Sequence, residues 1–119
     1  MMTPDEFFAG QAQSNQLFET VRREVEALGE SSMRVSKSQV AFRRRRGFAW
    51  VWMPGQYLKR KAAPLVLSLS LPRRDESPRW KEIVEPYPGR FMHHLELYDL
   101  AEFDNQVRNW LREAWEAGA

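Results

Sequence analysis

The clearest hydrophobic pattern in the chain is a strict alternation between residues 65 and 71. Leucines occupy positions 65, 67, 69 and 71, and serines occupy positions 68 and 70. Because successive side chains of a β-strand point to opposite faces, this period of two predicts a strand whose leucines face a core and whose serines face outward. Pro72 follows directly and ends the strand.

Apolar residues recur with helical spacing in two other segments, one toward each end of the chain. The first runs from about Ala12 to a C-capping Gly29, and its apolar face holds Leu17, Phe18, Val21, Val25 and Leu28. The second opens at Asp99, with Glu102 in capping-box spacing, and its face holds Leu100, Phe103, Val107, Trp110, Leu111 and Ala114. Thr3-Pro4-Asp5-Glu6 predicts a further short helical turn.

Shorter alternating runs at 33–37, 38–44, 48–53 and 90–98 predict four more strands. Gly47 is placed to take a positive φ in the turn before 48–53, and Ser77-Pro78 predicts a short helix that Pro86 ends. This order predicts an α+β fold, a two-layer, mainly antiparallel sheet of about five strands with N- and C-terminal helices packed on one face. A chain of 119 residues is the size of a single domain, 1–119.

Composition narrows the classes of function. There is no cysteine, so disulfides, thiol nucleophiles and thiolate metal sites are excluded. The N-terminal residues lack the basic and apolar regions of a signal peptide, and no apolar run approaches the length of a membrane span. We therefore expect a cytoplasmic protein that has no membrane partner.

Charge is strongly segregated along the chain, although the net charge is only +2. Residues 33–81 carry thirteen basic and two acidic side chains, a net charge of +11, whereas the segments 1–32 and 82–119 are acidic. One interpretation is that acidic helices simply attract a basic sheet. The same attraction between neighbouring copies would give a homo-oligomer, and an excess of positive charge also suits polyanionic partners.

Several longer segments carry a family resemblance: FFAGQ, VSKSQVAFRRRRGFAWVWMPGQYL, LVLSLSLPRRD and PRWKEIVEPYPGRFMHHLEL. Together these segments, from about Phe7 to Trp115, resemble a bacterial domain of unknown function, catalogued as family 5655. The resemblance implies a small cytoplasmic α+β domain. It implies no established activity, no cofactor and no catalytic residues.

The segment 46–52, RGFAWVW, resembles the aromatic strand with which RNA-recognition motifs stack bases. The order of elements argues against that fold, because the next predicted element is a strand and no strand precedes the first long helix. A three-residue turn would also place Phe48, Trp50 and Trp52 on the same face as Val40, in the core.

Four consecutive arginines are the leading candidate for a binding surface. Guanidinium groups at a turn can spread apart and hold phosphate or carboxylate groups with two hydrogen bonds each. The alternative is a solvated, positively charged loop with no ligand. The residues expected to contact a polyanion, possibly nucleic acid, are Arg43, Arg44, Arg45 and Arg46, with Lys59, Arg60 and Lys61 as secondary contacts.

The outward face of the sheet is the second candidate, as a site for a small anionic ligand. Alternation places on it Ser68, Ser70, His94, Glu96 and Tyr98, with Arg43 nearby. A Ser–His–Glu group is sterically possible there, but no glycine-rich nucleophile turn accompanies it, so we expect a non-enzymatic binding module with no catalytic residue and no cofactor. His93 and His94 are adjacent and point to opposite faces, which argues against a metal site.

Overall fold

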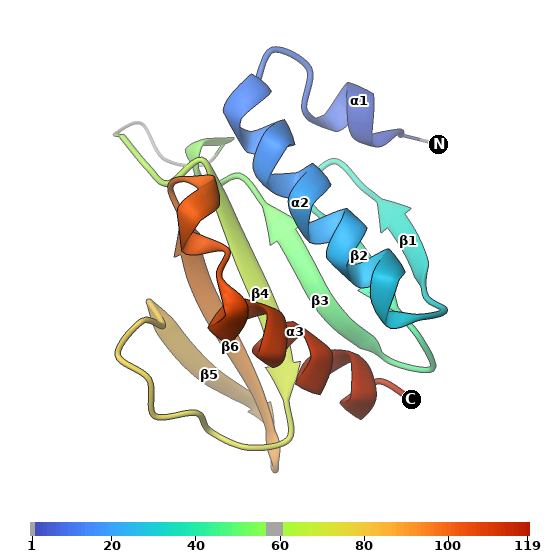
Figure 1. Ribbon diagram of the computed structural model, residues 1–119, viewed down its shortest axis with the longest axis vertical. Helices are drawn as coiled ribbons and strands as arrows, with labels where there is room; N and C mark the ends of the chain where they lie inside the picture. The colour runs from blue at the N-terminus through green and yellow to red at the C-terminus, as the bar shows by residue number, and fades with distance from the viewer. Residues whose placement is uncertain (1, 57–60) are drawn as a thin grey trace.

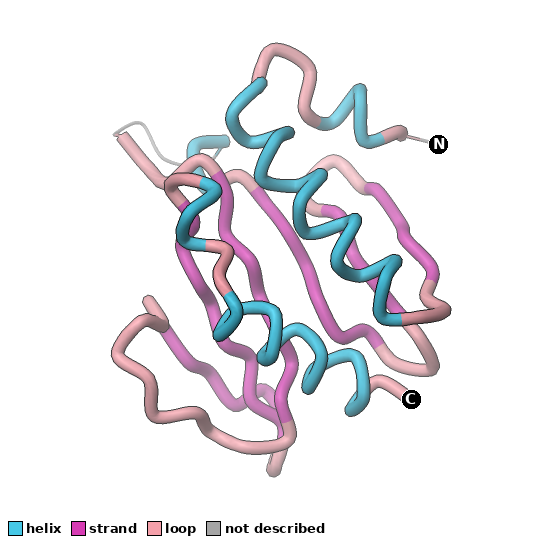
Figure 2. Tube along the Cα trace, in the orientation of Figure 1, coloured by secondary structure: helices cyan, strands magenta, loops and turns pink. Residues whose placement is uncertain are grey.

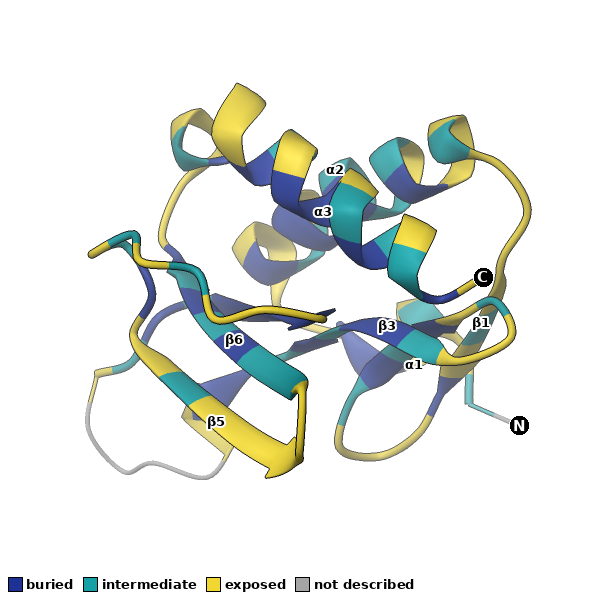
Figure 3. Cartoon of the chain, turned by 90° about the horizontal axis from the view of Figure 1, so that it is seen from below, coloured by how far each residue is buried: buried dark blue, intermediate teal, exposed yellow. Residues whose placement is uncertain are grey.

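The computed structural model describes residues 2–56 and 61–119. Within these residues six strands form one antiparallel sheet, in the order β1-β2-β3-β4-β6-β5, and two long helices cover one face (Figure 1, Figure 3). The strands are β1 (Ser32–Val35), β2 (Val40–Arg43), β3 (Gly47–Trp52), β4 (Leu65–Leu71), β5 (Glu82–Tyr87) and β6 (Arg90–Leu97). The helices are α1 (Pro4–Phe7), α2 (Ala12–Leu28) and α3 (Asn105–Ala117), with 3-10 turns at Pro54–Gln56 and Leu100–Glu102. The α+β class and its two layers are confirmed, with six strands rather than five.

Strand β4 lies inside the sheet, between β3 and β6, and all seven of its residues are buried. Its leucines face the helices as predicted, and the register aligns Leu67 with Val51 on β3 and with Leu95 on β6. The serines face the opposite side, the outer face of the sheet. Ser68 and Ser70 are nevertheless only 3% and 5% exposed, because larger side chains of β3 and β6 hydrogen-bond over them.

The N-terminal helices form where the sequence predicts them. Thr3 and Glu6 make the reciprocal hydrogen bonds of a capping box at the start of α1. Helix α2 buries the predicted apolar face and ends at Gly29, whose φ of 143° suits glycine. None of the helices in the described segments has the length and apolar character needed to cross a bilayer.

The C-terminal helix begins later than predicted. Asp99 and Glu102 form the expected capping box, but it opens only the 3-10 turn Leu100–Glu102. Asp104 then caps α3 by accepting a hydrogen bond from the Val107 backbone N–H. Leu100 is consequently exposed rather than buried, whereas the other residues of the predicted apolar face are buried. A second capping residue thus divides one predicted helix into two elements.

The segment after Ser77-Pro78 is a strand, and the predicted short helix there is wrong. Figure 2 shows this strand, β5, at the sheet edge beyond the long loop that follows β4. It pairs with β6 through a turn in which Gly89 has a φ of 79° and donates its N–H to the Glu85 carboxylate at 2.9 Å. Two β-branched residues, Ile83 and Val84, favour the strand, and pairing with β6 decides between the two conformations.

Candidate functional site

The arginine turn, residues 43–46, joins β2 to β3 and is fixed by the end of α3. The backbone N–H groups of Arg45 and Arg46 both donate to the Gly118 carbonyl, at 2.9 and 3.0 Å. Figure 1 shows the C-terminal end of the chain lying beside this turn. Because the carbonyl groups at a helix end lack partners within the helix, these two donors stabilise both elements. The turn is therefore held in one position on the body of the protein.

Arg44 differs from its three neighbours. Its guanidinium lies 3.7 Å from the centre of the Trp115 ring, and Nη1 donates to the Trp115 carbonyl at 2.9 Å. This side chain thus pairs with the C-terminal end of α3, where a cation is favoured. Arg43, Arg45 and Arg46 are exposed. Of the four arginines predicted to contact a polyanion, three are presented to solvent and one holds the turn in place.

Lys61, the one secondary basic residue among the described residues, does not extend the surface formed by Arg43, Arg45 and Arg46. Lys59 and Arg60 lie outside the described residues, and Lys61 is exposed just before β4. Register places the start of β4 beside Trp52, at the far end of β3 from the arginine turn. Lys61 is therefore separated from the arginine turn by the length of a strand.

A different basic residue, which the sequence did not single out, joins Arg46. Arg90, at the start of β6, donates from Nε to Ser70 at 2.8 Å and from Nη2 to the Gly47 carbonyl at 2.7 Å. A hollow of about 330 Å³ lies between the arginine turn and the β5–β6 turn, and both Arg46 and Arg90 line it. The Ser70 hydroxyl therefore positions the Arg90 side chain. Only the sheet register brings these two arginines together, so no local sequence signal could have found the pair.

The aromatic residues of β3 divide between the two faces of the sheet. A β-bulge opposite Phe42 and Arg43 inserts Phe48 as an extra residue, so that Phe48 points toward α3 and is fully buried. Trp50 and Trp52 pair with Ser68 and Val66 and lie on the outer face, half-buried. The predicted core position is therefore right for Phe48 and wrong for both tryptophans.

Gly47 has a role other than the predicted positive φ, which it does not adopt. A Cβ atom at this position would lie 2.7 Å from Cζ2 of Trp50. The absence of a side chain therefore allows the Trp50 ring to lie against the backbone of its own strand.

Ser68 and His94 meet on the outer face, as alternation predicted. The Nε1–H of Trp52 donates to the Ser68 hydroxyl at 3.1 Å, and that hydroxyl lies 2.6 Å from Nδ1 of His94. The remaining predicted residues do not join them. Glu96 forms an ion pair with Lys81 at 3.2 Å, and Tyr98 lies beyond the end of β6.

This arrangement disfavours a nucleophilic serine. Ser68 is 3% exposed, and its hydroxyl is already engaged by Trp52 and His94. A reacting carbonyl group would need to reach the oxygen along an open path, with donors for the developing negative charge nearby. The contact between Ser68 and His94 is better explained as a hydrogen bond that orients the imidazole ring.

His93 points to the opposite face from His94, as predicted. It is fully buried, accepts a hydrogen bond at Nε2 from the Asp75 backbone N–H at 3.0 Å, and packs against the Trp80 ring. Its Nδ1 lies 3.1 Å from the Phe91 carbonyl. Among the described residues, no three metal-ligating side chains gather at one point. His93 therefore serves to fasten the loop that follows β4.

Acidification is expected to destabilise the protein through both histidines. Burial lowers the pKa of His93 and of His94 below the ordinary value of about 6.5. The unfolded chain then takes up protons more readily, so the free energy of unfolding should fall as the pH drops below about 6.5. The loss should continue until the pH passes below the folded-state pKa values.

Urea unfolding between pH 7.5 and 4.5 measures this dependence, and His94→Gln should make it shallower. The Arg79 hydrogen bond lowers the pKa of Asp104, so that carboxylate adds a similar loss only at more acidic pH. A free energy of unfolding that stays constant from pH 7.5 to 5 would contradict the expectation.

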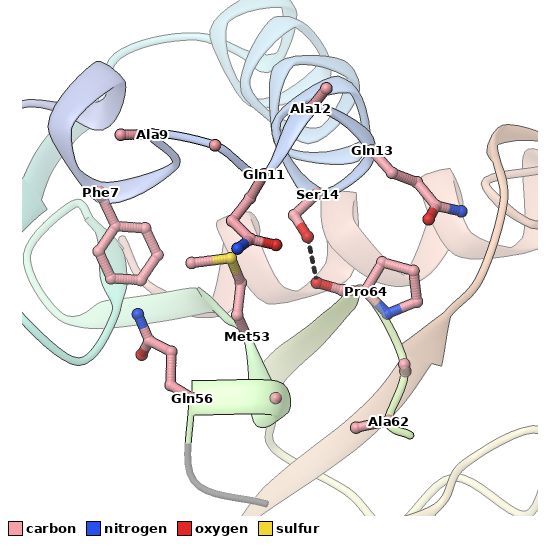
Figure 4. Close-up of a pocket in the computed structure, with 13 residues that line it drawn as sticks. Phe7, Ala9, Gln11, Ala12, Gln13, Ser14, Met53, Gln56, Ala62 and Pro64 are labelled. Atoms are coloured by element: carbon pink, nitrogen blue, oxygen red, sulfur yellow. Dashed lines mark hydrogen bonds between the residues drawn. The ribbon is translucent and has the colours of Figure 1, made fainter. Parts of the chain in front are cut away.

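Another hollow, of about 600 Å³, lies where α2 begins (Figure 4). The helix starts after Gln11, whose side chain makes no capping hydrogen bond, and the Ser14 hydroxyl donates to the Pro64 carbonyl at 2.7 Å. The side chains that line it within the described residues are neutral. Its walls include Gln56 and Ala62, on either side of residues outside the described part of the chain. We assign this hollow no role in binding.

Comparison with known proteins agrees with the resemblance seen in the sequence. The model of a family described as "Domain of unknown function (DUF5655)" matches residues 4–118. No curated protein and no solved structure gives a significant match. The family match spans nearly the whole chain, including both long helices and every strand described above. The chain therefore belongs to the DUF5655 family, a domain of unknown function.

Proposed function

We propose that this domain is a non-enzymatic binding module that holds polyanions, nucleic acid among them, at the arginine turn. The observation that carries the proposal is that the turn gathers four adjacent arginines with no carboxylate partner among the described residues. Among the described residues, Arg22, Arg73, Arg79, Lys81 and Arg108 form ion pairs with carboxylates, and no ion pair involves residues 43–46. The acidic helices therefore do not neutralise the positive charge of the turn.

The fixed position of the turn also favours this role. A flexible basic loop must lose conformational freedom when it binds, whereas this turn is already held by Gly118 and by the Arg44–Trp115 contact. Arg43, Arg45 and Arg46 then present guanidinium groups that suit phosphate oxygens. The hollow shared by Arg46 and Arg90 gives a phosphate group room beside the turn.

Binding to duplex DNA should be weak, independent of sequence and strongly dependent on salt. Each phosphate neutralised contributes about −0.9 to the slope of log K against log salt concentration. Three or four contacts should therefore weaken binding by roughly 40- to 150-fold between 50 and 200 mM salt. The triple variant R43Q/R45Q/R46Q should reduce the slope by about 2.7, and thermal stability should change little because exposed charges contribute little to it.

A matched control removes the same charge elsewhere. Arg23, Arg74 and Arg112 are also exposed and outside the ion pairs found among the described residues. The variant R23Q/R74Q/R112Q should keep most of the slope. Equal reductions of the salt slope in the two triple variants would show that binding depends only on the net charge of the protein. Absence of binding to DNA, RNA and heparin at 50 mM salt would contradict the proposal itself.

The proposal includes the cytoplasmic location expected from the sequence. Self-association through the segregated charges stays a prediction, and sedimentation at several protein concentrations tests it.

A further inference from the structure

The outer face of the sheet contains a hollow of about 410 Å³ with aromatic walls, the aromatic hollow. Its volume falls in the range of pockets that hold small ligands. It is lined by Ser38, Gln39, Trp50, Trp52, Ser68, Met92 and His94. None of these side chains carries a carboxylate, an ammonium or a guanidinium group. The lining therefore suits an uncharged group rather than the small anion expected from the sequence.

Trp50 provides a flat surface in the aromatic hollow. Its ring lies over Gly47, against the backbone of β3, and is half-buried. One face of the ring is thus covered by the strand, and the ring borders the aromatic hollow. The indole rings of tryptophans in such positions stack on planar rings, including nucleobases.

The hydrogen bonds beneath this surface are compatible with one tautomer of His94 that we take for the proposal. The Ser68 hydroxyl accepts from Nε1–H of Trp52 at 3.1 Å, and its own proton can be donated to Nδ1 of His94 at 2.6 Å. A neutral imidazole that accepts at Nδ1 carries its proton on Nε2. Within the described residues no hydrogen bond occupies Nε2. His94 thus holds an unused donor at the wall of the aromatic hollow.

We propose that the aromatic hollow binds a planar heteroaromatic ring with the chemistry of a nucleobase. The ring stacks on Trp50, and one of its ring nitrogen or carbonyl acceptors receives the Nε2–H of His94. The Gln39 amide and the Ser38 hydroxyl lie at the same hollow, and both donate and accept hydrogen bonds at a base edge. The base belongs either to a free nucleoside or nucleotide or to a single-stranded nucleic acid.

This site does not depend on polyanion binding at the arginine turn. The two sites share no lining side chain: the Trp50 ring lies over Gly47, which pairs with Arg43, but none of residues 43–46 lines the aromatic hollow. An uncharged nucleoside therefore tests the aromatic hollow alone. The variant R43Q/R45Q/R46Q should bind adenosine as the unmodified chain does, at every salt concentration.

The experiment titrates adenosine into the ¹⁵N-labelled protein and follows the five tryptophan indole N–H signals. Trp50→Leu should weaken binding by about five- to 150-fold, the range that base stacking supplies. Tyr98→Leu removes an exposed aromatic ring outside the aromatic hollow and should leave the affinity unchanged.

Two substitutions of His94 test the roles of its two ring nitrogens separately. His94→Gln keeps a donor near the place of Nε2, whereas His94→Asn keeps only a partner for Ser68 near the place of Nδ1. We expect His94→Asn to weaken adenosine binding by about three- to tenfold, as the loss of one hydrogen bond does, and His94→Gln to retain most of the affinity. Indole, which stacks but has no ring acceptor, should bind more weakly than adenosine by a similar factor.

The same variants tested with a single-stranded oligonucleotide distinguish the two sources of the base. Binding of adenosine that is lost in Trp50→Leu supports a free nucleoside or nucleotide. Binding of the oligonucleotide alone, weakened by the stacking factor in Trp50→Leu, supports a base within a strand. The proposal is overturned if no nucleoside binds and Trp50→Leu leaves oligonucleotide binding unchanged, or if indole binds as tightly as adenosine.

Discussion

Leu69→Ala is expected to lower the free energy of unfolding by about 2–5 kcal/mol. Leu69 is fully buried on β4, between Ala49 of β3 and His93 of β6 in register. Both neighbouring strands are hydrogen-bonded to β4, which limits how far the sheet can adjust to the space that the substitution leaves. Urea unfolding followed by circular dichroism measures the loss. The slope of the free energy of unfolding against urea concentration should stay unchanged.

Leu100→Ala is the matched control, because it makes the same chemical change at a position that is 49% exposed. Its expected cost is within about 0.5 kcal/mol. Similar losses in both variants would mean that Leu69 does not face the core.

Gly29→Ala is expected to cost roughly 2–4 kcal/mol, for two reasons that act together. Gly29 has φ 143° and ψ −156°, a backbone conformation that is open almost exclusively to glycine. A Cβ atom there would also lie 2.7 Å from Cζ2 of Trp115. The Trp115 ring would have to move, although its Nε1 donates to the Glu30 carbonyl and its face supports Arg44.

Gly10→Ala separates backbone strain from the steric clash. Gly10 also has a positive φ, 75°, but a Cβ atom there would meet nothing within 4 Å. Its cost should be about 1–2 kcal/mol, the cost of a left-handed conformation for a residue with a side chain. Equal losses of unfolding free energy at the two glycines would exclude the clash with Trp115. In a Trp115→Ala background, Gly29→Ala should cost less, by the part of the loss that the clash causes.

The elements that the sequence predicts correctly are those whose pattern is local. The leucine alternation of β4 and the apolar face of α2 depend only on positions a few residues apart, so periodicity was sufficient. The short helix predicted after Ser77-Pro78 failed because pairing with β6 outweighs the local preference of that segment. The late start of α3 has a different, local origin: Asp99 and Asp104 are both good capping residues, and the apolar pattern does not decide between them.

The candidate sites also divide into features that the local sequence pattern predicts and features that depend on contacts distant in sequence. The arginine turn was visible as a run of charge, but the separate role of Arg44 depends on Trp115, which is distant in sequence. The meeting of Ser68 with His94 followed from alternation alone. The outward position of Trp50 and Trp52 could not be predicted, because a single inserted residue, Phe48, changes which face each aromatic residue occupies.

The two hydrogen bonds from the arginine turn to Gly118 have a consequence for hydrogen exchange. The amide protons of Arg45 and Arg46 can exchange with solvent only when the end of α3 detaches, so their protection factors should follow the local opening of that helix. A polyanion that prefers the closed turn must, by linkage, make this opening less favourable. Occupancy of the turn would therefore appear as increased amide protection along the last residues of α3, which the polyanion itself does not contact.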